Sequence, residues 1–273
     1  MRMPEDKKPL ISAIMGVRYR RESLDLLRRA VESVLNQTVT DFEFLICDGG
    51  SSPEAGSLLD SYAETDSRIC LIREEKIPTD LAHKLNACLQ RAEGALIARM
   101  DDDDVSHPER FARQTSYLAE RPDIAFVGCN VALQAEGVTV GHRAFPEYPQ
   151  VKDFYFTQPF IHPTLVFRRE ALLAVGGYSE GKYQVLCEDY DLLLRFYMAG
   201  YRGANLQEDL FDYTVPASVK GNRRMHHRWN ETVTRWCRFK EMHLLPKALP
   251  YVVKPLVVGL LPEALLAKLK KQK

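Results

Sequence analysis

Short apolar runs alternate with amphipathic segments along the first hundred residues, and this alternation limits the possible folds more than any other feature. Buried strands are predicted at residues 10–15, 42–47, 69–72 and 96–98, where apolar runs of strand length occur. Helices are predicted at residues 22–37, 57–63 and 81–92, where apolar side chains recur at helical spacing. Strands that alternate with helices form a mostly parallel sheet covered by helices, so we predict an α/β fold.

Glycines and carboxylates follow three of these predicted strands. They are Gly16, the turn Asp48-Gly-Gly-Ser-Ser and the four aspartates at 101–104. Right-handed crossovers bring the carboxyl ends of parallel strands to one edge of a sheet, where open α/β sheets bind ligands. We therefore expect these residues to line a single crevice, and this convergence disfavours the alternative of a solvated acidic loop.

The four aspartates indicate a cation site. Carboxylates packed this closely repel one another unless a cation lies among them. Hard oxygen ligands suit Mg²⁺ or Mn²⁺, and these ions in turn suit phosphates. A calcium-binding loop is excluded, because counting from Asp101 puts Ser106 where such a loop needs glycine and Ala112 where it needs glutamate.

A second acidic cluster, Glu188-Asp189-Tyr190-Asp191, opens a predicted amphipathic helix at 188–199. Acidic side chains at a helix amino terminus interact favourably with the helix dipole, so a purely electrostatic role is an open alternative to a catalytic one. The rest of residues 105–219 is more mixed, with a predicted helix at 108–120, a predicted strand at 124–127 and a proline-rich stretch.

The bulk properties are those of an intracellular protein. At 273 residues the chain is long enough for one large domain, or for one domain with an appendage. Its six cysteines are widely spread and form no Cys-x-x-Cys pair, which favours buried free thiols in a reducing compartment. The amino terminus is too polar for a signal peptide, and no run of about 18 apolar residues occurs. We therefore expect a cytoplasmic protein without a membrane span.

The two ends of the chain carry opposite charge. Residues 220–273 hold 13 Lys and Arg against three acids, a net charge of +10, and residues 1–219 carry the balancing −10. A basic end of this kind suggests an anionic partner such as phosphate, membrane or nucleic acid. Residues 244–273 combine apolar stretches, prolines and clustered lysines, which suits an anionic membrane surface. A terminal helix packed on its own domain or on a second subunit is the open alternative.

Nine segments resemble one known family in their order and spacing. They are Pro9–Met15, Ala30–Thr38, Asp41–Phe44, Asp48–Ser52, Ala98–Asp104 followed by Pro108–Phe111, His162–Thr164, Gly176–Tyr178 and Glu188–Leu192. Together they resemble the inverting glycosyltransferases of family 2 across roughly residues 9–213. The resemblance implies the nucleotide-diphospho-sugar transferase fold called GT-A, with a mostly parallel central sheet flanked by helices.

The same resemblance implies a division of the chain. Residues 1–219 are expected to form the GT-A domain, with a nucleotide-binding half at about 9–104 and an acceptor half at about 105–219. Residues 220–273 are expected to form a helical, basic, amphipathic C-terminal extension.

Roles for individual residues also follow from the resemblance. Asp48 is expected to contact the uracil of a UDP-sugar, with Gly16 and Tyr19 in the same nucleotide site. Asp101 is expected at the ribose and, with Asp103, at the metal. Asp189 resembles the catalytic base that takes the proton of the acceptor hydroxyl, and Glu188 supports it. Further substrate contacts are expected from His162, Arg99, Asp104, Asp191 and Arg223. A structural histidine is the open alternative for His162, and a charged surface loop is the open alternative for Arg223.

The chain departs from the family pattern after the first predicted strand, where Arg18 occupies the more usual place of the tyrosine. This departure leaves the base contacts, including stacking by Tyr19, as the least secure part of the resemblance. The family reaction is a single displacement, so an α-linked donor gives a β-linked product.

The expected partners are a nucleotide-sugar donor and a glycan or lipid-linked acceptor in cell-surface polysaccharide biosynthesis, without nucleic acid. Peripheral association with an anionic membrane through 244–273 would place the enzyme at the inner face of the cytoplasmic membrane. The alternative function is a nucleotidyltransferase acting on sugar phosphates. It requires a glycine-rich loop bearing Lys or Arg after the first strand, and Gly16-Val-Arg-Tyr-Arg matches such a loop poorly.

Overall fold

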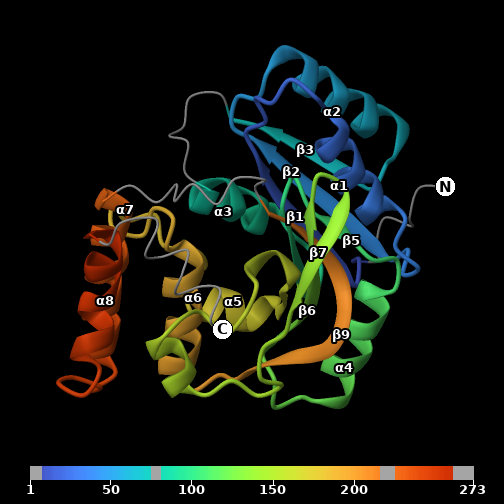
Figure 1. Cartoon of the computed structure of the whole chain (residues 1–273). Helices are drawn as coiled ribbons and strands as arrows, with labels where there is room; N and C mark the ends of the chain where they lie inside the picture. Colours follow the sequence, from blue (N-terminus) through green and yellow to red (C-terminus); the bar gives the residue numbers. More distant parts are fainter. Residues whose placement is uncertain (1–7, 75–80, 216–224, 261–273) are drawn as a thin grey trace.

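The amino-terminal half of the protein is a parallel sheet with helical crossovers, as predicted (Figure 1). The structure is a computed structural model, and it describes residues 8–74, 81–215 and 225–260. The four parallel strands, in the spatial order β3-β2-β1-β4, are β1 (Ile11–Val17), β2 (Phe42–Asp48), β3 (Ile69–Arg73) and β4 (Leu96–Met100). The helices between them are α1 (Asp25–Leu35), α2 (Pro53–Thr65) and α3 (Leu81–Arg91). The prediction of an α/β fold is confirmed.

The second half of the chain extends the same sheet and reverses its direction beside β4. The added strands are β8 (Val166–Arg168), β6 (Phe126–Ala135), β9 (Gly203–Thr214), β5 (Val105–Ser106) and β7 (Val138–Arg143), in the sheet order β3-β2-β1-β4-β8-β6-β9-β5 with β7 paired to β6. The strand β8 runs antiparallel to β4, and β6 runs parallel to β9. The prediction of a strand at 124–127 was too short, because β6 continues into a solvent-exposed ribbon with β7 that has no apolar run to mark it.

Two apolar cores cover the two faces of the sheet. Side chains of β1 alternate between them: Ala13 and Met15 join the core beneath α1, α2 and α4 (Arg110–Glu120), whereas Ile14 joins the core beneath α3. The second core also contains α5 (Arg169–Ala174) and α6 (Glu188–Met198). Because all seven residues of β1 are buried, the strand shows the continuous apolar run that is typical of a central parallel strand.

The C-terminal extension forms two helices, α7 (Met225–Glu241) and α8 (Leu249–Leu260), which lie together at one side of the molecule (Figure 1). Phe239 of α7 and Val252 of α8 join the core shared with α3 and α6. The helical extension is thus confirmed up to Leu260, and the remaining residues of 244–273 lie outside the described part. Within the described ranges, no helix is long and apolar enough to cross a membrane.

The described cysteines are free thiols, as expected. Cys47, Cys88, Cys129 and Cys187 are buried, whereas Cys70 and Cys237 are exposed. The two exposed positions differ from the expectation of buried thiols, because Cys70 faces outward on β3 and Cys237 lies on the outer side of α7.

Candidate active site

The ends of β1, β2 and β4 bring the predicted nucleotide-binding residues to one edge of the sheet. Strand register pairs Val17 with Asp48 and Met15 with Met100, so Gly16 lies between the ends of its two neighbours. The aspartates at 101–104 follow β4 directly in a turn. The predicted convergence is therefore present, and it results from parallel pairing of strands that are far apart in the sequence.

Asp48 is held in place by two neighbours. Its Oδ1 accepts hydrogen bonds from the Ser51 backbone N–H at 2.9 Å and from the Ser51 hydroxyl at 2.6 Å. Its Oδ2 forms an ion pair with Arg73, which lies directly opposite at the end of β3. Arg73 also binds Asp60 at 2.5 Å. The end of β2 thus offers a carboxylate and a guanidinium side by side, and the sequence analysis had not singled out Arg73.

The four aspartates occupy four different environments. Asp101 pairs with Arg99, Asp103 pairs with the exposed Arg21 at 2.5 Å, and buried Asp104 accepts a hydrogen bond from the Thr214 backbone N–H at 2.7 Å. Asp104 therefore ties the turn to the end of β9, which favours a structural role over the substrate contact expected from the sequence. Asp101 and Asp103 keep part of their side-chain surface exposed, at 30% and 25%.

Burial and then mutual repulsion raise the pKa values of two carboxyl groups in this turn. Burial, together with the charges of Asp103 and Asp101, raises the pKa of Asp102 to about 7. Burial followed by the charge of Asp101 also raises the pKa of Asp103. A cation close to these carboxylates would favour their ionised forms. The turn therefore suits a cation, and in this structure Arg21 supplies the positive charge at Asp103.

The donor set fits a metal that is held mainly by a substrate. Within residues 8–74, 81–215 and 225–260, no group of three or more His, Cys, Asp or Glu side chains is arranged to hold a metal ion. Mg²⁺ typically takes one or two protein carboxylates and completes its octahedral shell with water and substrate phosphates. Asp101 and Asp103 supply two carboxylates of this kind, so the site fits such an ion when a phosphate-bearing ligand is present.

Lys84 is a second residue of this edge that was not predicted from the sequence. It projects from α3 across the strand ends and is only 6% exposed, yet it makes no hydrogen bond or ion pair with any described residue. A Cβ on Gly16 would lie 3.0 Å from the Lys84 Cβ, and a Cβ on Gly49 would lie 3.0 Å from its Cδ. The two glycines therefore make room for the lysine side chain, in addition to any room they leave for a ligand.

The charge of Lys84 has no direct partner. Burial lowers the pKa of Lys84, and the charges of Asp102, Cys47 and Asp48 oppose this effect. The side chain is largely covered while its ammonium nitrogen still reaches solvent, so an anion that binds there would replace the hydration lost through burial. Lys84 thus indicates an anion-binding position between Asp48 and the aspartate turn.

Tyr19 does not occupy the position expected of a base-stacking residue. It is 2% exposed, packs in the core beneath α1, and its hydroxyl donates to the Ser23 carbonyl at 2.9 Å. Stacking on a nucleotide base would require this ring to leave the core. The neighbouring Arg18, which occupies the more usual place of the tyrosine, is exposed, whereas the Tyr19 side chain is buried.

The second acidic cluster lies at the amino terminus of α6. Asp189 is partly exposed, and its Oδ1 accepts a hydrogen bond from the Tyr190 backbone N–H at 2.7 Å, whereas Glu188 is buried. Burial raises the pKa of the Tyr178 hydroxyl, and the positive charge of Arg99 opposes this increase. The negative charges of Asp189 and Asp101 raise the pKa further. Carboxylates of the two acidic clusters, which are far apart in the sequence, therefore act on the same hydroxyl group.

Arg99 and His162 lie in the interior near the Tyr178 hydroxyl. Arg99 is fully buried, and its Nε and Nη1 atoms have no hydrogen-bond partner among the described residues. The His162 Nε2 atom lies 3.0 Å from the Tyr178 hydroxyl. Burial, with the Arg99 charge adding to it, holds the pKa of His162 well below its ordinary value, so His162 is neutral at physiological pH. Arg223 lies outside the described residues.

Asp191 is a structural residue in this arrangement. It is completely buried, with its Oδ2 on Arg195 at 2.8 Å and its Oδ1 on Arg238 at 2.7 Å. These ion pairs join the start of α6 to its own next turn and to α7. Both carboxylate oxygens are occupied inside the protein, which favours a structural role over the substrate contact expected from the sequence.

Asp191→Asn is expected to lower the free energy of unfolding by about 3 kcal/mol, because breaking a buried ion pair leaves its partners uncompensated. Donor affinity should be unchanged. Thermal and urea unfolding measure the first effect, and calorimetric titration with nucleotide measures the second. The matched control is Asp123→Asn, which breaks the exposed pair with Arg121 and should have little effect on the free energy of unfolding. Weaker substrate binding with unchanged stability would contradict the structural role.

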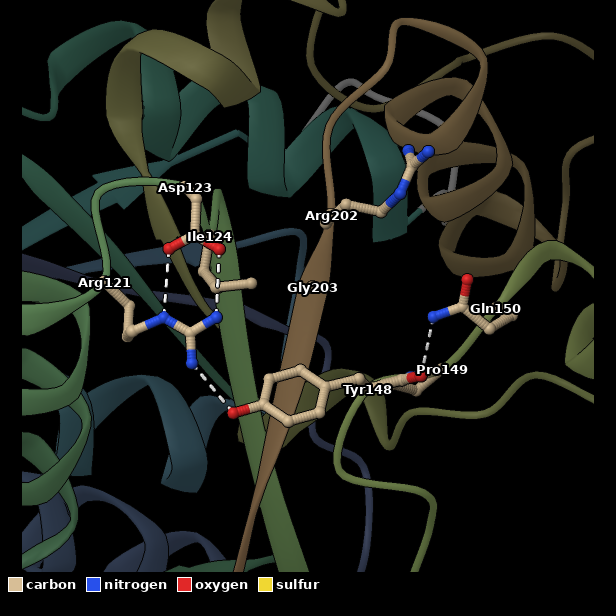
Figure 2. A pocket seen from close by; sticks show the side chains of 8 residues that line it. All are labelled: Arg121, Asp123, Ile124, Tyr148, Pro149, Gln150, Arg202 and Gly203. Carbon is tan, nitrogen blue, oxygen red and sulfur yellow. Dashed lines mark hydrogen bonds and ion pairs between the residues drawn. The ribbon is translucent and has the colours of Figure 1, made fainter.

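Two surface cavities lie away from this edge. One of about 180 Å³ is formed near the amino-terminal ends of β6 and β9, and Figure 2 shows the Arg121 guanidinium directed at both Asp123 and the Tyr148 hydroxyl. The other, of about 310 Å³, lies between α3 and the end of α5. None of the predicted site residues lines either cavity, so the candidate site rests on the strand-end residues.

Comparison with family models identifies the chain's relatives. Residues 14–176 match the model described as Glycosyl transferase family 2, and residues 96–267 match that described as Glycosyl transferase family group 2. The chain is 34% identical over 211 residues to the O-antigen biosynthesis glycosyltransferase WbnJ of Escherichia coli, covering 76% of this chain and 80% of WbnJ. It is 29% identical over 265 residues to the putative glycosyltransferase EpsE of Bacillus subtilis, covering 97% and 94%.

Solved structures share the fold at low identity. The structure of S. aureus TarS residues 1–349 in complex with UDP-GlcNAc superposes with a TM-score of 0.69 at 16% identity, over 89% of this chain and 72% of that one. The mannosyltransferase PcManGT from Pyrobaculum calidifontis, in complex with GDP-Man and Mn²⁺, superposes with a TM-score of 0.61 at 20% identity, over 98% and 81%.

Proposed function

Because the chain belongs to glycosyl transferase family 2 and has the GT-A fold, it is a sugar-transferring enzyme, and we propose that it transfers a sugar from a UDP-sugar donor to an acceptor hydroxyl with inversion. UDP is chosen as the nucleotide because the fold relative TarS binds UDP-GlcNAc, although PcManGT binds GDP-Man. Family membership sets aside the alternative of a nucleotidyltransferase acting on sugar phosphates.

The observation that carries the donor site is the unpaired, buried Lys84 at the edge of the sheet. A diphosphate oxygen would supply the anion that Lys84 lacks. On one side of Lys84, Asp48 and Arg73 offer the hydrogen-bond acceptor and donors that a pyrimidine base requires. On the other side, the turn that contains Asp101 lies where the ribose and the phosphates would follow.

We propose a divalent metal at Asp103 and Asp101, and the fold relative PcManGT, solved in complex with GDP-Man and Mn²⁺, supports the presence of such an ion. Bound Mg²⁺ or Mn²⁺ would neutralise negative charge on the departing UDP. The exposed Arg21 now paired with Asp103 would have to turn away for the ion to bind. Its side chain lies at the surface and is free to do so.

Asp189 is the proposed general base. Its partly exposed carboxylate would accept the proton of the acceptor hydroxyl while that oxygen forms a bond to the anomeric carbon and the bond to UDP breaks. The amino-terminal end of α6 favours the ionised carboxylate. Glu188, buried beside it, is proposed to hold Asp189 in place.

The acceptor is proposed to be a glycan, carried on a lipid, in the synthesis of a cell-surface polysaccharide. The relative WbnJ is named for O-antigen biosynthesis, which supports this class of product. A lipid-linked acceptor would place the enzyme in the cytoplasm, at the inner face of the membrane.

Lys84→Met tests the donor site. The change keeps the buried side-chain stem and removes the charge, so we expect UDP to bind about 10- to 100-fold more weakly, the range of one charge-assisted hydrogen bond. The unliganded variant should be at least as stable as the parent, because a buried unpaired charge has been removed. Calorimetric titration with UDP, UDP-GlcNAc and GDP-Man measures affinity and base preference, and exposed Lys152→Met is the control. Unchanged UDP affinity in Lys84→Met would contradict the proposal.

A further inference from the structure

The two C-terminal helices expose apolar side chains on their outer surfaces. On α7, Trp229 and Trp236 are 51% and 46% exposed, and Met225 lies on the same side of the helix at a spacing of four residues from Trp229. On α8, the exposed apolar residues recur every three or four positions, and they are Leu249, Val253, Val257 and Leu260. We call these seven side chains the α7–α8 face.

This face is separate from the surfaces that the two helices use for packing. Asn230, Thr234 and Phe239 of α7 are buried against the domain, and Tyr251 of α8 stacks on Tyr155 with ring centroids 5.2 Å apart. The end of α8 meets the start of α7, since a Cβ on Gly259 would lie 3.2 Å from the Met225 Cε atom. The exposed residues are therefore not required for the core. They form a surplus apolar surface over two adjoining helices.

The surroundings of the face are basic. Lys240 is exposed one helical turn after Trp236, and Lys247 is exposed just before α8. The sequence after α8 contains four lysines and one glutamate, and residues 220–273 as a whole carry +10 against −10 for residues 1–219. Tryptophan and aliphatic side chains flanked by lysines are the composition of helices that lie in the interface of a membrane.

We propose that the α7–α8 face binds the surface of an anionic phospholipid bilayer. The proposal deepens the function given above, on which it rests, by assigning the surface through which the enzyme reaches a lipid-linked acceptor. A second copy of the chain is the less suitable occupant, because a symmetric contact would bring two strongly basic surfaces together. An anionic headgroup layer instead compensates their charge.

The same helices are joined to the proposed catalytic base. Arg238 of α7 binds Asp191 of α6 at 2.7 Å, and Arg235 donates to the Tyr155 carbonyl at 2.8 Å. Asp189 lies two residues before Asp191 on the same helix. A docked α7 would thus hold the acceptor side of the site at a fixed position relative to the bilayer.

The chain provides its own probe, because its only two tryptophans, Trp229 and Trp236, both lie on this face. Vesicles of phosphatidylglycerol should shift their fluorescence emission to shorter wavelength and carry the protein down on sedimentation. Vesicles of pure phosphatidylcholine should have a much smaller effect, and added salt should weaken binding to phosphatidylglycerol. No shift and no sedimentation with phosphatidylglycerol would overturn the proposal.

Two double variants test whether the α7–α8 face is the surface that binds the vesicles. Val257→Glu with Leu260→Glu should weaken partition onto phosphatidylglycerol vesicles at least tenfold, while both tryptophans remain as reporters. Val138→Glu with Val140→Glu, on exposed positions of β7, makes the same change of charge elsewhere and should bind like the parent. Equal weakening by both pairs would show a general charge effect and overturn the assignment.

Two further measurements separate the remaining outcomes. All variants should bind UDP like the parent, so a failure of donor binding and a failure of membrane docking are distinguished. Analytical ultracentrifugation without vesicles should show that the α8 variants and the parent have the same oligomeric state. A parent dimer that dissociates in Val257→Glu with Leu260→Glu would assign the face to a second copy and overturn the membrane proposal.

Discussion

Asp189→Asn is expected to lower the turnover number for sugar transfer by about 10²- to 10⁴-fold, the range supplied by a positioned general base. Asparagine preserves the shape of the side chain, and its amide oxygen accepts the hydrogen bond that the Tyr190 backbone N–H now gives to Asp189. It cannot take a proton from the acceptor hydroxyl at neutral pH. Donor binding should therefore be unchanged while the chemical step fails.

The measurement is single-turnover transfer from a radiolabelled UDP-sugar, together with UDP affinity by calorimetry. Asp153→Asn changes a half-buried acid outside the site that also accepts a backbone hydrogen bond, from the Gln150 N–H at 2.7 Å, and it is the matched control for a loss of one carboxylate. Turnover within a factor of about three of the parent would remove Asp189 as the base. Loss of UDP affinity along with turnover would assign Asp189 to donor binding instead.

Asp103→Asn is expected to abolish the enhancement of UDP binding by Mn²⁺ or Mg²⁺. In the parent, the divalent ion should strengthen UDP binding by about 100-fold, or about 2.7 kcal/mol, because it links the carboxylates to the diphosphate. With chelator present, the variant and the parent should bind UDP similarly, because without the ion Asp103 has no metal-mediated link to the diphosphate that the substitution could remove.

Arg21→Ala is the informative companion to this variant. Arg21 pairs with Asp103 in the structure, so its removal should leave Asp103 available and preserve the effect of the metal. Calorimetric titration of UDP with Mn²⁺, Mg²⁺ or chelator compares the three proteins. If the parent binds UDP equally well with and without divalent ions, and Asp103→Asn changes nothing, the metal assignment is wrong.

The alternating pattern of residues 10–100 predicted the parallel half of the sheet because each element there is buried on a regular period. A central parallel strand such as β1 is apolar throughout, and a crossover helix is apolar at every third or fourth position. Residues 126–143 could not be predicted in the same way. The first seven residues of β6 are buried, but the end of β6 pairs with β7, which is mostly exposed, so this pairing is specified by backbone hydrogen bonds that leave little trace in the composition.

The sequence alone also placed Gly16, Asp48 and the aspartate turn at one edge, because the ends of parallel strands must meet there. It did not identify Lys84, since a lysine in an amphipathic helix normally faces solvent. Tyr19 was assigned to the nucleotide by resemblance, whereas its ring packs in the core. For Tyr19 the difference depends on which way a side chain turns just after a strand ends. Lys84 instead lies at helical spacing from Leu81 and Cys88, so only its residue type argued against burial.

The four aspartates therefore show which properties of the site the sequence determines and which only the tertiary structure determines. Their position after a buried strand, and hence their place at the binding edge, follows from local periodicity and chain connectivity. Their separate environments do not: Asp101 meets Arg99, Asp103 meets Arg21, and Asp104 meets the backbone of Thr214. Electrostatic interactions and hydrogen bonds depend on distances between groups in space, and folding brings those groups together from segments that the sequence keeps far apart. Only the tertiary structure could decide which carboxylate is exposed to a ligand and which one holds the protein together.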